Sequence, residues 1–398
     1  MLSNPPAPTR LTSGGAPPPT ARPRAWQAVV VFVGVAVVLY LVMGAVAPRL
    51  PEVSGPRLAP PFTGPGWLAG WAQWDSGWYR QIVVEGYSYV VGQQSTVAFF
   101  PAYPIVVGAV RAVVGDAYVA GIVVTFLAGA GVAALLAGWL RARLSPAAAW
   151  AALLAFLLFP YAFFLYGVVY ADAVFIAAVL GAFLLLESDR PVLAGLAGAV
   201  ATAARPVGVV VVLGLVVLAL ERRGALWPFD RRRLRWADAG VLLSLVGLGA
   251  WCLYLWSRFD DPLAFAGAQA AWEQGAGLET WLKFQFFRDV ADLRSPPAWI
   301  LFMAHPVLTV GAACLLPAVY RRFGAAYAIY AGLLIGVSAI STKNFFGMAR
   351  YLLAAFPCFA VLGELLVERP ALRRVVLPAS GVGLVVLTAV FGTGYYLS

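Results

Sequence analysis

The chain has 398 residues, of which 62% are hydrophobic and only 12% are charged, and its mean hydropathy is +0.83. Soluble domains are about 45–50% apolar and about 25% charged, so a water-soluble core cannot bury this much apolar surface. The composition excludes a soluble globular protein and predicts an all-α membrane protein that crosses the bilayer many times. Three cysteines and one histidine indicate neither a disulfide framework nor a cluster of metal ligands.

The first 25 residues differ in composition from the rest of the chain. They are rich in Pro, Gly, Ser and Thr, which predicts a disordered cytoplasmic tail (1–25) ahead of a single transmembrane domain (26–398). The apolar run from Trp26 to Ala47 ends in Ala-Val-Ala, as a cleaved signal peptide would. It is, however, longer than the apolar region of about 7–15 residues in signal peptides. We therefore expect a transmembrane helix here.

A long polar segment follows and ends in a short apolar run. This run, 99–114, is interrupted by Pro101, Pro104 and Arg111. It is shorter than the roughly 17–25 residues that a helix needs to span a bilayer. We therefore expect an interfacial or re-entrant helix inside a first long loop at 48–116.

Further apolar runs are candidates for transmembrane helices. Arg205-Pro206 divides the longest of them, because proline cannot donate a backbone hydrogen bond inside a helix and arginine is costly in lipid. With the first run they predict a bundle of about eleven transmembrane helices and a second large loop at 258–297. The further runs are 117–140, 146–166, 170–187, 191–204, 206–220, 238–257, 298–320, 325–341, 349–367 and 375–397.

The charges predict how this bundle is oriented. With the N-terminus in the cytoplasm, the cytoplasmic segments hold 17 of the 28 basic residues and the whole net charge of +10. The positive-inside rule expects this asymmetry, so the basic excess indicates topology in a cell membrane and not nucleic-acid binding. The two long loops then lie outside the cytoplasm. If 99–114 crossed the membrane and the run through Arg205 were one helix, Arg141 and Arg143 would move outside, which fits the rule less well.

One stretch of the first outer loop contains the residue types that sugar transfer needs. Moving a sugar onto a hydroxyl requires a carboxylate to accept the proton, aromatic faces for the sugar and a cation for the departing phosphate. The alternative is an aromatic belt at the membrane surface with a solvated aspartate. The stretch is Trp74-Asp75-Ser76-Gly77-Trp78-Tyr79-Arg80.

Charged residues in or beside apolar runs are a second group of candidates. Arg205 lies in the middle of its run, where an arginine is by default a functional candidate that could hold a lipid phosphate. The alternative is a structural ion pair with Asp172, which follows Tyr170 near the start of another run. Lys343 and Arg350 flank a short outer turn, where they could bind a phosphate or extend to ordinary lipid headgroups.

Three weaker candidates complete the set. His305 lies in the outer part of its predicted helix, where such a histidine more often packs between helices. Gln269 and Trp272, in the second outer loop, could hold an acceptor.

The sequence has no P-loop, no GxGxxG followed by an acidic residue and no metal-ligand spacing. We therefore expect an activated sugar to arrive on a lipid and not on a nucleotide.

Five short motifs follow one another between about residues 70 and 360. They are Trp74-Asp75 with Tyr79 and Gly86-Tyr87; Phe99-Phe100-Pro101-Ala102-Tyr103-Pro104; Pro160 with Tyr170-Ala171-Asp172; Ala204-Arg205-Pro206-Val207-Gly208; and Ala349-Arg350-Tyr351 with Phe356-Pro357. In this order they resemble the PIG-V-like family, which comprises the second mannosyltransferase of GPI-anchor synthesis and its bacterial relatives. Asp172 stands where the family usually has glutamate, which keeps the carboxylate but shortens its reach.

The resemblance implies a GT-C-type bundle with interfacial helices in its first outer loop. It also implies inverting transfer of a sugar, expected to be mannose, from a polyprenyl phosphate to an extracytoplasmic lipid, glycan or protein acceptor. Asp75 is then the expected general base, and Arg205, Lys343 and Arg350 are the expected phosphate ligands, an assignment that follows the charges more than the family. The other expected substrate-binding residues are Trp74, Trp78, Tyr79, Arg80, Tyr170, Asp172, Gln269, Trp272, His305 and Tyr351.

Three alternatives stay open at this point. GT-C enzymes include metal-dependent and metal-independent members. Because this sequence has few carboxylates that could bind a metal, we expect no cofactor, and a divalent metal is the alternative. The donor could carry another lipid-linked sugar. A transporter or flippase of a lipid-linked substrate would also use arginines within the membrane, but transporters commonly have repeated halves, and this sequence has none.

Overall fold

A computed structural model of the protein describes residues 21–46, 62–272, 277–292 and 295–397. Within these ranges all regular structure is helical, which confirms the predicted fold class. Most of the predicted tail and part of the first long loop fall outside the described residues. The α-helices are α1 (Ala25–Val46), α2 (Ser76–Glu85), α3 (Ala102–Val114), α4 (Ala117–Arg143), α5 (Pro146–Leu157), α6 (Asp172–Glu187), α7 (Pro191–Ala204), α8 (Val209–Arg222), α9 (Leu245–Phe259), α10 (Ala264–Ala270), α11 (Leu278–Trp281), α12 (Phe284–Asp292), α13 (Pro296–Phe323), α14 (Ala325–Ser341), α15 (Met348–Tyr351), α16 (Phe356–Glu368) and α17 (Pro370–Gly392).

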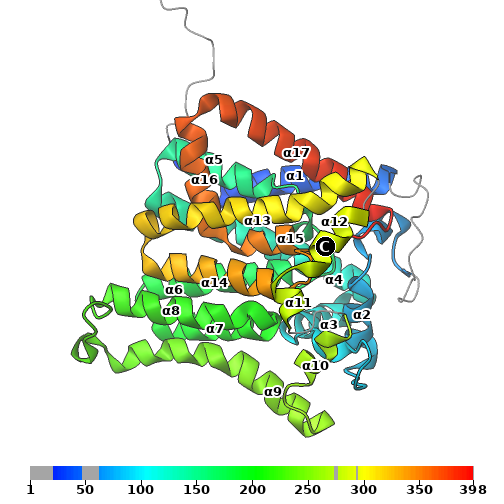
Figure 1. The fold of residues 1–398 in the computed structure, drawn as a ribbon, viewed down its shortest axis with the longest axis horizontal. Coiled ribbons are helices and arrows are strands. Elements are labelled where there is room, and N and C mark those ends of the chain that lie inside the picture. Colours follow the sequence, from blue (N-terminus) through cyan, green and yellow to red (C-terminus); the bar gives the residue numbers. More distant parts are fainter. Residues whose placement is uncertain (1–20, 47–61, 273–276, 293–294, 398) are drawn as a thin grey trace, which may run out of the picture.

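The longer helices lie side by side in one bundle (Figure 1). The central helix α4 packs against α1, α3 and α6, and α7 packs against α6 and α9. Shorter helices, α2, α3, α10, α11, α12 and α15, gather at one end of the bundle. The segment after α17 returns to that same end, so residues from many parts of the chain meet there.

Membrane-spanning helices can be recognised by length and composition. Among the described residues, five helices qualify, or six if α15 and α16 form one span bent by 86°. The five are α1, α4, α13, α17 and the continuous helical stretch Trp236–Phe259. Shorter apolar helices, including α5, α7 and α14, accompany them. The chain is therefore a multi-pass membrane protein, and the total of eleven spans stays a prediction.

Helix ends follow local side-chain chemistry. The Asp116 carboxylate accepts a hydrogen bond from the backbone N–H of Val119 at 2.9 Å and starts α4. Ser145 does the same for α5, where Pro146 occupies the first helical position. The predicted span 146–166 is wrong in its second half, since α5 ends at Leu157. Pro160 explains this end, because a proline disfavours helix in the residue before it and cannot donate to the helix.

Two other predicted spans are not α-helical throughout. The run 349–367 consists of α15, the short 3₁₀ helix η8 (Leu352–Ala354) and α16, which meet at the sharp bend. The run 238–257 begins as a 3₁₀ helix, η7 (Trp236–Ser244), and continues as α9. The predicted break at Arg205-Pro206 is confirmed: α7 ends at Ala204, and the 3₁₀ helix η5 (Pro206–Gly208) precedes α8.

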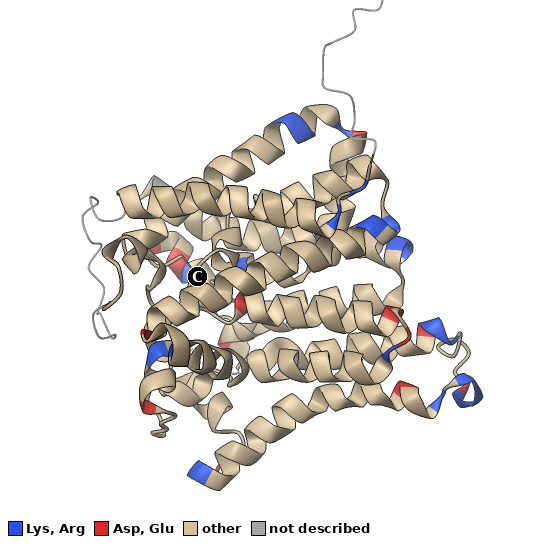
Figure 2. Cartoon of the chain, turned by 180° about the vertical axis from the view of Figure 1, so that it is seen from behind, with Lys and Arg blue, Asp and Glu red and all other residues tan. Residues whose placement is uncertain are grey.

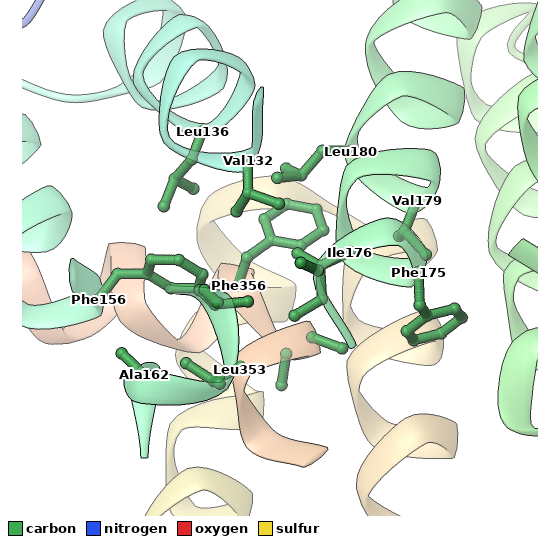
Figure 3. Close-up of a cluster of buried hydrophobic side chains, with 14 of the residues drawn as sticks. Val132, Leu136, Phe156, Ala162, Phe175, Ile176, Val179, Leu180, Leu353 and Phe356 are labelled. Atoms are coloured by element: carbon green, nitrogen blue, oxygen red, sulfur yellow. The ribbon is translucent and has the colours of Figure 1, made fainter. Parts of the chain in front are cut away.

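The apolar core lies between α4, α5, α6 and the α15–α16 bend (Figure 3). Aromatic and branched side chains from these helices interdigitate, and substituting one of them by alanine costs about 2–5 kcal/mol in a well-packed core. Charged residues, in contrast, lie mainly at the two ends of the bundle, with a large basic group around the α8–η7 connection (Figure 2). The buried residues drawn in Figure 3 include Val132, Leu136, Phe156, Ile176, Leu353 and Phe356.

Candidate active site

Four charged side chains from distant parts of the sequence meet at the end of the bundle that holds the short helices. Arg205 Nη1 forms an ion pair with Asp172 Oδ1. Arg350 Nε lies 3.8 Å from the same oxygen, and Arg350 Nη1 lies 4.0 Å from Asp75 Oδ2. We call Asp75, Asp172, Arg205 and Arg350 the charged cluster. Its charges alternate and sum to zero, which lets them share a poorly solvated site.

The members of the charged cluster differ in their access to solvent. The Asp172 side chain is only 4% exposed, and the two arginines are also largely buried. The Asp75 side chain is 25% exposed. Asp75 is therefore the carboxylate that an incoming molecule can reach, whereas Asp172 is positioned to hold the two guanidinium groups in place.

Asp75 immediately precedes α2, and its carboxylate does not cap that helix. Its backbone N–H instead donates to the Tyr170 hydroxyl at 3.1 Å. Burial raises the pKa of the Asp75 carboxyl above its ordinary value, and the nearby Arg350 guanidinium opposes that rise. A carboxyl with a raised pKa is a better proton acceptor than an ordinary solvated aspartate, as long as it is ionised at the working pH.

Arg205 reaches the charged cluster because α7 ends at Ala204, immediately before it in the chain. Pro206 cannot continue the helix, and Arg205 adopts an extended backbone with φ −153° and ψ 147°. Its guanidinium carbon lies 4.5 Å from the centre of the Tyr351 ring. This is cation–π geometry, which holds a guanidinium group while its N–H groups remain directed at oxygen atoms.

Arg350 lies in the single turn of α15, inside an aromatic enclosure. The centres of the Tyr170, Tyr351 and Phe164 rings lie 4.9, 5.0 and 5.1 Å from its guanidinium carbon. The turn is held from α13, because the backbone N–H of Ala349 donates to His305 Nδ1 at 3.3 Å. His305 is itself buried. The hydrogen bond between Ala349 and His305 joins α13 to the turn that carries Arg350, and the predicted role of His305 in substrate binding stays a prediction.

A small pocket opens beside the charged cluster. Its volume accessible to the centre of a water molecule is about 10 Å³, enough for about one water molecule. Three of its lining side chains are charged, and the others are apolar or aromatic. The lining consists of Asp172, Phe175, Ile176, Arg205, Val207, Leu334, Arg350, Tyr351 and Ala354.

The aromatic residues predicted in the two outer loops also come together. The Trp78 ring lies 5.5 Å from Trp272 and 6.0 Å from Phe99, measured between ring centres. Tyr79 is buried and lies 4.9 Å from the Tyr103 ring. The contact between Trp78 and Trp272 joins the α10 region to the first outer loop.

Three other predicted residues do not line the pocket. Arg80 pairs with Glu85 at 3.0 Å on α2. Gln269 is half-buried near the end of α10, and Lys343 is half-buried in the turn before α15. Neither belongs to the pocket lining described above. Their roles stay predictions.

Lys283 and Tyr396 are among the residues near the site that were not predicted. Lys283 Nζ donates to the Thr342 carbonyl, and it lies 5.1 Å from the centre of the Phe345 ring, so the second outer loop is tied to the turn before α15. Tyr396, after α17, packs on Trp74. A lone loop lysine and an aromatic residue at the end of an apolar run are common in membrane proteins, so neither carried a signal.

Across the described residues, no group of three or more His, Cys, Asp or Glu side chains could hold a metal.

No family model and no curated protein matches the chain. Solved structures do. ArnT from Cupriavidus metallidurans bound to undecaprenyl phosphate matches 93% of this chain and 76% of its own, with a TM-score of 0.51 and 16% identity. The apo state of that ArnT gives a TM-score of 0.48 at 17% identity, over 94% of this chain and 77% of its own. The oligosaccharyltransferase of Archaeoglobus fulgidus gives a TM-score of 0.47 at 14% identity, over 91% of this chain and 53% of its own.

The ArnT match establishes the fold. The protein has the architecture of the GT-C membrane glycosyltransferases, as the sequence motifs predicted. Membership in the PIG-V-like subfamily stays a prediction.

Proposed function

We propose that the protein is an inverting glycosyltransferase that moves a sugar from a polyprenyl phosphate to an acceptor hydroxyl. The observation that carries the proposal is the charged cluster: a solvent-accessible carboxylate, Asp75, lies 4.0 Å from a buried arginine, Arg350, within a GT-C fold. A base and a phosphate ligand side by side are the two groups that this reaction needs. The undecaprenyl phosphate bound to the similarly folded ArnT supports a lipid carrier.

The donor phosphate is proposed to bind the guanidinium groups of Arg205 and Arg350. Guanidinium groups bind phosphate oxygens through paired, charge-assisted hydrogen bonds. Asp172 already neutralises part of their charge, so a phosphate diester with a single negative charge suits the site better than a more highly charged nucleotide.

The reaction then follows from where the charges lie. The acceptor hydroxyl oxygen attacks C1 of the sugar from the face opposite the phosphate and forms the new glycosidic bond. The bond between C1 and the phosphate oxygen breaks, and its electron pair leaves with the polyprenyl phosphate, whose charge the arginines stabilise. Asp75 accepts the hydroxyl proton. One displacement inverts the configuration at C1.

The finer identity of the substrates rests on the sequence motifs. We propose mannose as the sugar and a lipid, glycan or protein outside the cytoplasm as the acceptor, with the charged cluster on the extracytoplasmic side. The distribution of basic residues supports this orientation, because the large basic group lies at the opposite end of the bundle (Figure 2).

The test is a transfer assay in reconstituted vesicles. Radiolabelled polyprenyl-phosphate mannose and a lipid extract are supplied on the side of Asp75, and the labelled product is identified. A labelled glycoside made by the wild type and not by Asp75→Asn is expected. Movement of the intact donor across the bilayer without transfer would contradict the proposal and favour a flippase.

A further inference from the structure

Three aromatic rings form a row beside the charged cluster. The Tyr396 ring lies 4.7 Å from Trp74 and 5.2 Å from Phe346, measured between ring centres. Phe346 and Tyr396 are stacked with an angle of 22° between their planes. We call Trp74, Tyr396 and Phe346 the aromatic row.

The aromatic row joins the two segments that carry the reacting charges. Trp74 immediately precedes Asp75, and Phe346 lies in the turn that leads into α15 and Arg350. Trp74 adopts a φ of +52°, a left-handed conformation that non-glycine residues rarely take and that often marks a functional site. The row therefore connects the residue before Asp75 with the turn that leads to Arg350.

Tyr396 is not there merely to fill the core. The residue after it, Leu397, is 2% exposed and is the one that enters the core. Tyr396 itself is 38% exposed although it contacts two other rings. Figure 1 places this end of the chain at the end of the bundle where the short helices gather. More than a third of the Tyr396 surface thus stays accessible, and its ring contacts Trp74, the residue before the partly exposed Asp75.

We propose that the aromatic row, with Tyr396 at its centre, is the subsite for the sugar ring of the lipid-linked donor. This inference rests on the proposed function and adds the part of the protein that distinguishes a sugar-bearing lipid from a bare lipid phosphate. A pyranose has an apolar C–H face that packs against the electron-rich face of an aromatic ring, while its hydroxyls remain available to polar groups. The arginines bind the phosphate, the row binds the sugar, and C1 lies between them near Asp75.

Binding measurements in detergent micelles test the subsite without relying on transfer. Two ligands with the same prenyl chain are compared: polyprenyl phosphate and polyprenyl-phosphate mannose. The wild type should bind the sugar-bearing lipid more tightly. Tyr396→Leu should weaken binding of that lipid by about 3- to 10-fold, the size of one aromatic contact, and leave binding of the bare lipid phosphate unchanged. Tyr396→Phe, which keeps the ring, should behave as the wild type.

The neighbouring Tyr395 provides a matched control. Its side chain packs against the main core, so Tyr395→Leu should not change the ratio of the two affinities. If Tyr396→Leu does not yield folded protein, Phe346→Leu removes another ring of the row and permits the same comparison.

Three results are informative. Equal weakening of both lipids by Tyr396→Leu, or equal binding of both lipids by the wild type, would overturn the subsite. A sugar-dependent affinity that requires Tyr396, in a protein that transfers no sugar, would uphold the subsite and refute the proposed transferase function.

Discussion

Arg350 lies between Asp75 and Asp172, 4.0 Å from a carboxylate oxygen of the first and 3.8 Å from one of the second. The two carboxylates and the arginine come from three separate segments. A phosphate that binds Arg350 therefore competes with both aspartates. Donor binding would draw the guanidinium away from Asp75 and leave that carboxylate free to accept a proton.

Asp75→Asn should abolish most transfer while leaving the protein folded. The substitution is nearly isosteric and removes the proton acceptor, and a general base typically contributes about 10²–10⁴-fold to a rate. Turnover should fall by that order in the vesicle assay, with affinity for the bare lipid phosphate within a few-fold of wild type. Near-normal turnover would mean that the base lies elsewhere, and Asp172 would be the next residue to test.

The acid limb of the pH–rate profile should depend on Arg350. Asp75 acts as a base only when it is ionised, so activity is lost as the pH falls through its pKa. Burial raises that pKa and Arg350 lowers it. Arg350→Gln should therefore raise the pKa further and move the acid limb to higher pH, whereas Arg350→Lys, which keeps the charge, should move it less.

The control for this pH shift is Arg111→Gln. Arg111 donates to the Val83 carbonyl of α2, so its loss removes a positive charge without touching the charged cluster. Its profile should match the wild type. An acid limb that stays in place in Arg350→Gln would show that Asp75 is not the titrating base.

Arg205 and Asp172 should be coupled in stability. Removing one partner of a buried ion pair costs about 3–5 kcal/mol, because the other charge stays buried without compensation. Arg205→Leu and Asp172→Leu should each lower the melting temperature in detergent. The melting temperature of the double variant should fall by less than the sum of the two single decreases, whereas the effects of independent substitutions would add. Additive losses would contradict a direct interaction.

Arg205 should also affect donor binding. Arg205→Lys retains the positive charge but loses the planar arrangement of N–H groups, so it should weaken binding of polyprenyl phosphate. Arg205→Ala should weaken binding more strongly. Unchanged affinity in both folded variants would exclude Arg205 as a phosphate ligand.

The orientation in the membrane can be tested by cysteine labelling. In a variant without Cys252, Cys314 and Cys358, a cysteine at exposed Ser88 should react with an impermeant reagent added outside the cell. A cysteine at exposed Arg232, in the basic group at the other end, should react only after the membrane is opened. The reverse pattern would invert the topology and place the charged cluster in the cytoplasm.

The sequence alone determined the properties that depend on neighbouring residues. Long apolar runs required a membrane, and a proline that cannot donate a hydrogen bond ended α7 at Ala204. Arg205 and Arg350 were recognisable because charges beside or within apolar runs are costly and are kept only with partners. Asp75 was recognisable because it stands among aromatic residues and Arg80, the residue types that sugar transfer needs.

Only the tertiary structure decided which partners those are. Asp172 was an expected partner of Arg205, but its additional contact with Arg350 depends on how α6, α7 and α15 pack. The hydrogen bond from Ala349 to His305 and the position of Tyr396 on Trp74 likewise join segments that are remote in sequence. Hydrophobic periodicity predicts which side of a helix faces apolar surroundings. It does not predict which distant segment packs against that side, because the packing of the whole bundle determines this.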